Sequence, residues 1–249
     1  MKDFSHYQKS FVLLSGGLDS TTALAIAEKF HSNNGGIVEA ISIDYGQRHI
    51  KETQIAKATC DRKGINHTIL DLKGFAGNCM LTDKDSAVPD ISYDAIKGVS
   101  PTYVPFRNGV MLSRLAAYAQ EYVNSIKDQF PGSSLADLCT IWFGAHAEDA
   151  KAWAYPDCTP EFVGAMANAI HVGTYYTTRL SVPFLSLDKS QIVAWGDKLG
   201  VDYANTWSCY KGEELHCGTC PTCRSRKDAF KQAGVVDPTI YADSDKAAA

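Results

Sequence analysis

Residues 15–20, which read SGGLDS, have the residue types and the order that a phosphate-binding turn needs. Glycines allow a positive φ and let the backbone approach a ligand closely. Successive N–H groups at the start of a helix form a concave site for anions, and hydroxyl groups add further donors. We therefore predict a phosphate or pyrophosphate site built from Leu14, Ser15, Gly16, Gly17, Leu18, Asp19, Ser20, Thr21 and Thr22.

This segment differs from two common nucleotide-binding loops. No Gly-Lys-Ser or Gly-Lys-Thr follows the glycines, as a Walker A loop requires, and the Gly-x-Gly-x-x-Gly dinucleotide pattern is missing. The alternative is an ordinary Gly-Gly turn between a strand and a helix. Asp19 also has two interpretations, either a carboxylate that binds a metal ion or organises the loop, or the N-cap of the next helix.

Four of the eight cysteines cluster near the end of the sequence with the spacing C-x7-C-x2-C-x2-C. They are Cys209, Cys217, Cys220 and Cys223. Four thiolates suit a closed tetrahedral Zn²⁺ site, although the tight pitch of the last three also occurs in iron–sulfur proteins. His216 is an alternative ligand. The helix that follows is predicted to present a solvated basic face with Arg224, Arg226, Lys227 and Lys231.

The bulk composition excludes several classes of protein. The chain has 249 residues, 45% of them hydrophobic and 21% charged, and a net charge of −4, so no basic footprint for nucleic acid is present. No apolar run reaches the roughly 18 residues of a membrane span, and the first residues lack a signal-peptide core. The other four cysteines are scattered singly, which favours a reducing compartment. We expect a cytoplasmic protein.

The hydrophobic pattern places residues 15–20, which we call the phosphate loop, within an α/β fold. Short β-prone runs predict strands at residues 11–14, 37–44, 67–72, 138–144 and 180–184. Helical spacing predicts helices at residues 21–29, 49–63, 110–130, 159–172 and 190–199, and residues 74–101 are expected to be mostly loop. Alternation of this kind gives a parallel sheet covered on both faces, with ligands at the carboxyl ends of the strands.

Several further motifs join the phosphate loop and the cysteines. They are YGQRH at residues 45–49, VPFRN at 104–108, YPDC at 155–158, LxKxxI at 187–192, TWSCY at 206–210, CGxCxxC at 217–223 and DPT at 237–239. With these motifs the chain resembles, nearly end to end, the 7-cyano-7-deazaguanine synthase (QueC) family of PP-loop ATP pyrophosphatases. The loop alone indicates only the superfamily, and its combination with the four cysteines narrows the resemblance.

The resemblance implies a fold and a reaction. The fold is an α/β sandwich with a parallel sheet, adenine nucleotide α-hydrolase-like (HUP/Rossmann-like), over residues 1–205. Residues 206–249 form a small C-terminal zinc-binding and helical segment. The reaction converts 7-carboxy-7-deazaguanine and ammonia, through an adenylated carboxylate and an amide, to the nitrile, with release of AMP and pyrophosphate. ATP, Mg²⁺ and Zn²⁺ are the implied cofactors, and the implied assembly is a homodimer with no membrane or nucleic-acid partner.

The resemblance also assigns roles to residues of this sequence. It implies ATP binding by residues 14–22, catalytic roles for Asp19, Ser20, Arg107 and Lys189, and substrate binding by Arg107, Asn108, Tyr155, Pro156 and Asp157. Taken singly, an arginine or a lysine is more often a surface charge. Arg48 and His49 belong either to the site or to an ordinary helix start.

One stretch departs from the family pattern, in which Ser-Gly precedes Tyr-Pro-Asp-Cys and Arg follows it. Here Trp153 and Ala154 precede the motif and Thr159 follows it. Either another cation, such as Arg179 or Lys151, holds the substrate carboxylate, or the substrate differs.

Three alternative functions stay open at this point. One is a related enzyme that joins the deazaguanine to another amine or stops at the amide. The second is a tRNA-modifying ATP pyrophosphatase, although such enzymes carry RNA-binding domains or a catalytic cysteine pair in the ATP-binding core. The third is a nucleotide-binding module without catalysis.

Overall fold

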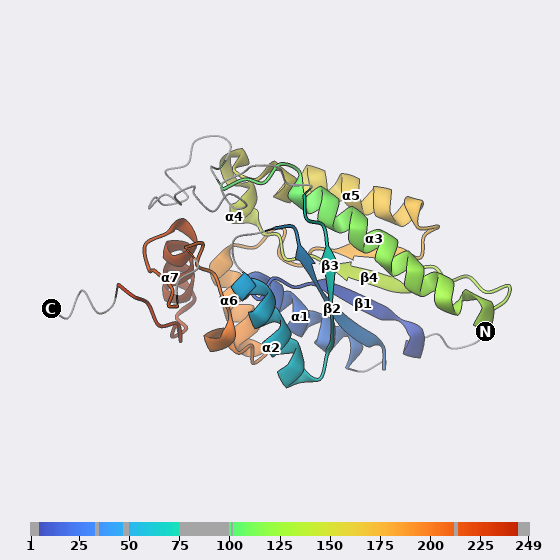
Figure 1. The fold of residues 1–249 in the computed structure, drawn as a ribbon, viewed down its shortest axis with the longest axis horizontal. Coiled ribbons are helices and arrows are strands. Elements are labelled where there is room, and N and C mark those ends of the chain that lie inside the picture. Colours follow the sequence, from blue (N-terminus) through green and yellow to red (C-terminus); the bar gives the residue numbers. More distant parts are fainter. Residues whose placement is uncertain are drawn as a thin grey trace.

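The computed structural model describes residues 5–32, 35–46, 50–74, 100, 102–211 and 214–243. Within them a single five-stranded parallel sheet forms the centre of the molecule, in the order β3-β2-β1-β4-β5 (Figure 1). The strands are β1 (Lys9–Leu13), β2 (Ile37–Asp44), β3 (Asn66–Asp71), β4 (Cys139–Trp142) and β5 (Thr178–Ser181). This is the doubly wound order of Rossmann-like folds, so the predicted class is confirmed.

Helices follow the strands and cover both faces of the sheet (Figure 1). They are α1 (Leu18–His31), α2 (Ile50–Lys63), α3 (Arg107–Ile126), α4 (Ala147–Ala150), α5 (Pro160–Gly173), α6 (Lys189–Lys198) and α7 (Pro221–Ala233). Short 3-10 turns lie at Ser5–Tyr7, Lys127–Gln129, Lys151–Trp153, Pro156–Cys158 and Tyr203–Asn205. None of the described helices has both the length and the apolar composition needed to cross a bilayer.

Alternation along β1 produces the two layers of the core. Phe11 and Val12 are both fully buried, but their side chains enter different hydrophobic clusters. Phe11 packs with Leu112 of α3, whereas Val12 packs with Leu24 of α1 and Ile192 of α6. Because successive side chains of a strand point to opposite faces, one apolar run supplies both layers.

Two helices, α1 and α3, begin earlier than predicted, and this changes the position of two expected site residues. Helix α1 begins at Leu18 and α3 begins at Arg107, three residues earlier than expected in each case. Asp19 and Arg107 therefore lie in the first turns of helices. The predicted loop at residues 74–101 and the residues Arg48 and His49 lie almost entirely outside the described part of the chain.

The prediction that Arg226 lies on a solvated basic face of α7 is wrong. Its side chain is only 1% exposed, because it points inward. The guanidinium donates to the Tyr203 carbonyl at 3.0 Å and to Thr206 Oγ1 at 2.8 Å, and it forms an ion pair with Asp237 at 3.3 Å. Arg226 therefore ties α7 to the segment that leads from α6 to the first cysteine of the cluster.

Replacing this buried arginine should destabilise the fold. Arg226→Ala removes one partner of a buried ion pair and leaves Asp237 without its charge partner, which costs about 3–5 kcal/mol of unfolding free energy. Urea unfolding measures the loss. Lys231→Ala removes an exposed charge from the same helix and should leave the midpoint unchanged. Equal midpoints for the two variants would contradict the inward role of Arg226.

Candidate functional site

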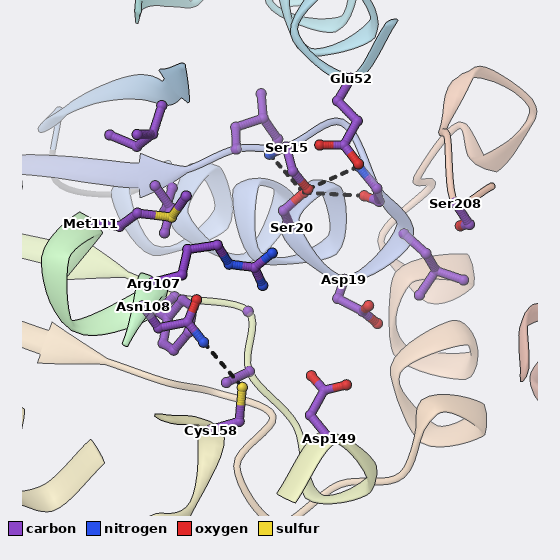
Figure 2. A pocket seen from close by; sticks show the side chains of 18 of the residues that line it. Ser15, Asp19, Ser20, Glu52, Arg107, Asn108, Met111, Asp149, Cys158 and Ser208 are labelled. Carbon is purple, nitrogen blue, oxygen red and sulfur yellow. Dashed lines mark hydrogen bonds between the residues drawn. The ribbon is translucent and has the colours of Figure 1, made fainter. Parts of the chain in front are cut away.

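The phosphate loop opens into a cavity of about 250 Å³ at the carboxyl ends of the strands. The wall includes the loop after β1, the carboxyl ends of β2 and β4, the first turns of α2, α3 and α6, the segment from α4 to Cys158, and the segment around the first cysteine of the cluster (Figure 2). A cavity in this position of a doubly wound sheet is the expected ligand site.

The phosphate loop is held in shape by its neighbours. Gly16 has φ +78°, and a Cβ atom there would lie 2.9 Å from the carbonyl oxygen of Glu52 in α2. On its other side, the Trp207 N–H donates to the Gly16 carbonyl at 2.8 Å. Ser20 Oγ accepts the Ser15 N–H at 3.2 Å and lies 3.1 Å from Ser15 Oγ. Only glycine fits this position, both in φ and in space.

Asp19 belongs to a small charged cluster and does not cap α1. Gly17 occupies the N-cap position, and Asp19 Oδ2 lies 3.7 Å from both Lys189 Nζ and His146 Nε2. His146 is 2% exposed, and its Nε2 also lies 3.3 Å from Asp149 Oδ2. Figure 2 shows the carboxylates of Asp19 and Asp149 facing each other across the cavity.

The charges around Lys189 favour its cationic form. Burial lowers the pKa of the Lys189 amine, but Asp19, Asp149 and Glu148 outweigh that effect, so the pKa lies above its ordinary value. The Lys189 N–H, at the start of α6, donates to Glu148 Oε1 at 3.1 Å. Lys189 is therefore a fixed positive charge on the side of the cavity formed by α6.

Arg107 supplies positive charge from the first turn of α3. Phe106, the residue before it, has φ +53°, and its N–H donates to Tyr103 Oη at 2.9 Å. A left-handed conformation costs a residue other than glycine about 1–2 kcal/mol, so the surrounding turn must hold it. Arg107 Nη1 contacts Tyr45 Oη at 3.4 Å, and the guanidinium points into the cavity in Figure 2.

The residues after Arg107 connect two of the motifs. Asp157 Oδ2 accepts the Asn108 N–H at 3.0 Å at the start of α3, and Asn108 Nδ2 donates to Cys158 Sγ at 3.2 Å. Burial raises the pKa of the Cys158 thiol well above its ordinary value. Cys158 is the one cysteine of the cavity wall in the described ranges, so no thiolate nucleophile and no cysteine pair faces the cavity there.

The structure brings together most of the residues that the sequence singled out, but not all of them. Those in the cavity wall are Leu14, Ser15, Gly17, Leu18, Asp19, Ser20, Arg107, Asn108, Tyr155 and Lys189. Those outside the wall are Gly16, Thr21, Thr22, Pro156 and Asp157. Gly16 shapes the loop from behind, and the Thr22 hydroxyl is buried against Leu18 and Tyr203.

The alternative cations do not reach the cavity. Arg179 is bound to Asp137 at 2.7 Å on the surface, and Lys151 is exposed. The cations of the wall, within the described residues, are Arg107 and Lys189.

The site residues expected from the sequence do not include several wall residues, among them Glu52, Asp149, Ser208 and Tyr210. Asp149 had a signal, because it lies in an acidic stretch between β4 and the YPDC motif. Ser208 and Tyr210 belong to a motif that was noted without a role. Glu52 gave no signal, because nothing in the sequence says which face of α2 meets the phosphate loop. Loss of water raises the pKa of Glu52 to about 7, and the charge of Arg107 opposes that rise.

The four clustered cysteines form the candidate metal site. The sulfur atoms of Cys209, Cys217, Cys220 and Cys223 all lie within 4.8 Å of one another and are buried. Backbone N–H groups of Thr219 and Cys220 point at Cys217 Sγ from 3.4 and 3.3 Å, which stabilises a thiolate. This donor set suits a tetrahedral, closed Zn²⁺ site.

His216 does not belong to this ligand set. Its Nε2 accepts the Ser208 N–H at 3.1 Å, and its ring lies 4.2 Å from the Trp207 ring. It supports the segment that contacts the phosphate loop.

The chemistry available at the cavity is therefore that of anion binding and charge stabilisation. Backbone N–H groups and hydroxyls of the loop face the same space as two fixed cations, and two carboxylates face each other where a divalent cation can bind. Asp19 Oδ1 is buried and has no hydrogen-bond partner among the described residues, as a metal-binding oxygen would.

Comparison with known proteins identifies relatives over almost the whole chain. The family model described as "Queuosine biosynthesis protein QueC" matches residues 9–234. The 7-cyano-7-deazaguanine synthase 1 of Colwellia psychrerythraea is 38% identical over 94% of this chain and 99% of that protein. The 7-cyano-7-deazaguanine synthases of Caldicellulosiruptor saccharolyticus and Methanoregula boonei are each 41% identical over 94% of this chain, covering 95% and 99% of those proteins.

The packing of the phosphate loop predicts that Gly16→Ala impairs ligand binding. The left-handed φ costs about 1–2 kcal/mol, and the new Cβ displaces the loop from α2. We expect the affinity for ATP, measured by calorimetry, to fall at least about tenfold. Gly64→Ala is the matched control, because Gly64 has φ +66° but open space around it. Equal affinities in the two variants would show that the close packing does not matter.

The cysteine cluster predicts that Cys220→Ser loses its bound metal and much of its stability, because metal binding at a structural site contributes folding free energy. Elemental analysis of the purified protein and thermal unfolding measure both effects. Cys60→Ser changes a buried cysteine outside the cluster and should keep the metal. A metal-free Cys220→Ser protein with unchanged thermal stability would contradict a structural role.

Proposed function

Because the chain belongs to the QueC family, we propose that it is an ATP-dependent 7-cyano-7-deazaguanine synthase of queuosine biosynthesis. In this reaction a carboxylate, 7-carboxy-7-deazaguanine, is adenylated and then converted by ammonia to the amide. A second ATP activates the amide oxygen, and loss of AMP leaves the nitrile. The observation that carries the proposal is that the phosphate loop opens into a cavity that both Arg107 and Lys189 line.

The first step needs a carboxylate oxygen to attack the α-phosphorus of ATP while pyrophosphate leaves. A carboxylate is a weak nucleophile and both partners are anions, so positioned positive charge lowers the barrier. The loop N–H groups and the hydroxyls of Ser15 and Ser20 bind the departing pyrophosphate. Lys189, at the start of α6, neutralises charge that develops on the phosphates.

Arg107 is the residue that we assign to the substrate carboxylate. It lines the same cavity as Lys189, so two cations are available to the two anionic ligands. A guanidinium binds a carboxylate with two parallel hydrogen bonds, which fixes the direction of attack. The arginine that the family pattern has after Tyr-Pro-Asp-Cys is replaced here by Thr159, which accepts the Phe162 N–H at 3.3 Å as the N-cap of α5.

Mg²⁺ fits the facing carboxylates of Asp19 and Asp149, both hard oxygen donors. When bound there it supplies Lewis-acid stabilisation of the phosphate charge. The protein's own contribution is to hold these carboxylates beside His146 and Lys189. Zn²⁺ is the ion that we assign to the cysteine cluster, where no open ligand position is needed.

The later steps require no nucleophile from the protein. Ammonia attacks the carbon of the acyl-adenylate, and AMP leaves. The raised pKa of Cys158 keeps its thiol protonated and weakly nucleophilic. This agrees with the scheme, in which no covalent protein intermediate forms. The cytoplasmic location stays an expectation from the sequence, and the homodimer stays an expectation from the resemblance.

The test is mass spectrometry of the products formed from 7-carboxy-7-deazaguanine, ATP, Mg²⁺ and an ammonium salt. We expect the nitrile, with AMP and pyrophosphate. Asp19→Asn should lose AMP formation, by a factor of about 100 or more, while its unfolding midpoint stays near that of the unaltered protein.

Each other outcome has a meaning. Accumulation of the amide without nitrile would contradict the complete reaction and favour a relative that uses another amine. No AMP at all would contradict adenylation of this substrate.

A further inference from the structure

Glu52 is a carboxylate beside the phosphate loop to which the scheme above gives no role. It lies in the first turn of α2, and its side chain reaches the cavity near Ser15 and Ser20 (Figure 2). The α2 backbone packs directly against the loop, since the Glu52 carbonyl is within 2.9 Å of the position of a Cβ on Gly16. Main-chain packing therefore fixes where this carboxylate stands.

The other carboxylates near the cavity already have a role or a partner. Asp19 and Asp149 face His146, and Asp157 accepts the Asn108 N–H. Within the described ranges, by contrast, no hydrogen bond and no ion pair joins the Glu52 side chain to another residue, and Arg107 acts on it only through its charge. Its acceptor oxygens are therefore available to a ligand.

The environment of Glu52 suits proton transfer near neutral pH. Loss of water around the carboxylate raises its pKa to about 7, and Arg107 opposes the rise. A group with a pKa close to the working pH both accepts and releases protons readily. Bound phosphates would repel the negative charge of the Glu52 carboxylate. A nitrogen nucleophile becomes cationic as it reacts, and the Glu52 carboxylate attracts that positive charge.

We propose that Glu52 is the general base of the amide-forming step. Ammonia attacks the acyl carbon, the C–N bond forms, and the bond between that carbon and the AMP oxygen breaks with its electron pair leaving on AMP. The nitrogen, positively charged in the adduct, loses one proton to the Glu52 carboxylate, which later releases it to solvent. The products are the neutral amide and AMP. This role rests on the proposed function.

The experiment separates the two halves of the reaction. Exchange of labelled pyrophosphate into ATP, with 7-carboxy-7-deazaguanine but no ammonium, reports adenylation alone. Rapid-quench amide formation from the same enzyme, with ammonium added, reports the second half. For Glu52→Gln we expect amide formation to fall by about 100-fold and the exchange rate to fall far less. Glu52→Asp should recover part of the amide rate.

The pH dependence of the amide-forming rate is a second readout, because a purely structural role of Glu52 would not produce it. At constant free-ammonia concentration, the amide rate of the unaltered protein should decline as the pH falls through about 7, because Glu52 becomes protonated and cannot accept a proton. That decline should be absent from Glu52→Gln. Glu161→Gln, on the exposed first turn of α5, is the matched control and should behave as the unaltered protein.

The outcomes are distinct. Normal amide formation by Glu52→Gln would overturn the inference, and so would an equal loss of both half-reactions, which would place Glu52 in nucleotide or metal binding. No substrate-dependent exchange by the unaltered protein would refute the proposed function itself, and the inference with it.

Discussion

The close packing of the Gly16 backbone is the constraint on which the site depends. The left-handed turn at Gly16 lets α2 press against one side of the phosphate loop, and the Trp207 N–H holds its carbonyl from the other. The N–H groups of the loop are therefore directed before any ligand arrives, and such preorganised donors need no rearrangement during reaction. The cysteine cluster contributes to this packing, because Trp207 Nε1 donates to the Cys209 carbonyl at 2.9 Å.

This packing also explains why the C-terminal segment belongs to the site. The expected division at residues 205 and 206 runs through the cavity wall, since Ser208 and Tyr210 lie beside the loop. Arg226 ties the same segment to α7 from inside the fold. A metal ion bound at the cysteines would therefore stabilise a wall of the cavity, and with it the position of the phosphate loop.

Features that depend on a local sequence pattern could be predicted from the sequence. The strands follow from short apolar runs, and residues 15–20 and the four cysteines follow from residue types at fixed spacing. Contacts between distant segments were not predictable in this way. The inward turn of Arg226, the carboxylate of Glu52 at the cavity and the facing pair Asp19 and Asp149 all depend on how helices pack, which no local pattern encodes.

The proposed reaction requires a substrate carboxylate to attack ATP in this cavity. Oxygen transfer tests it most directly: the enzyme converts 7-carboxy-7-deazaguanine labelled with ¹⁸O in its carboxylate, and the AMP is analysed by mass spectrometry. We predict one labelled oxygen in each AMP, because both the carboxylate and the later amide pass their oxygen to the α-phosphorus. AMP that carries oxygen from water instead would contradict the proposed reaction.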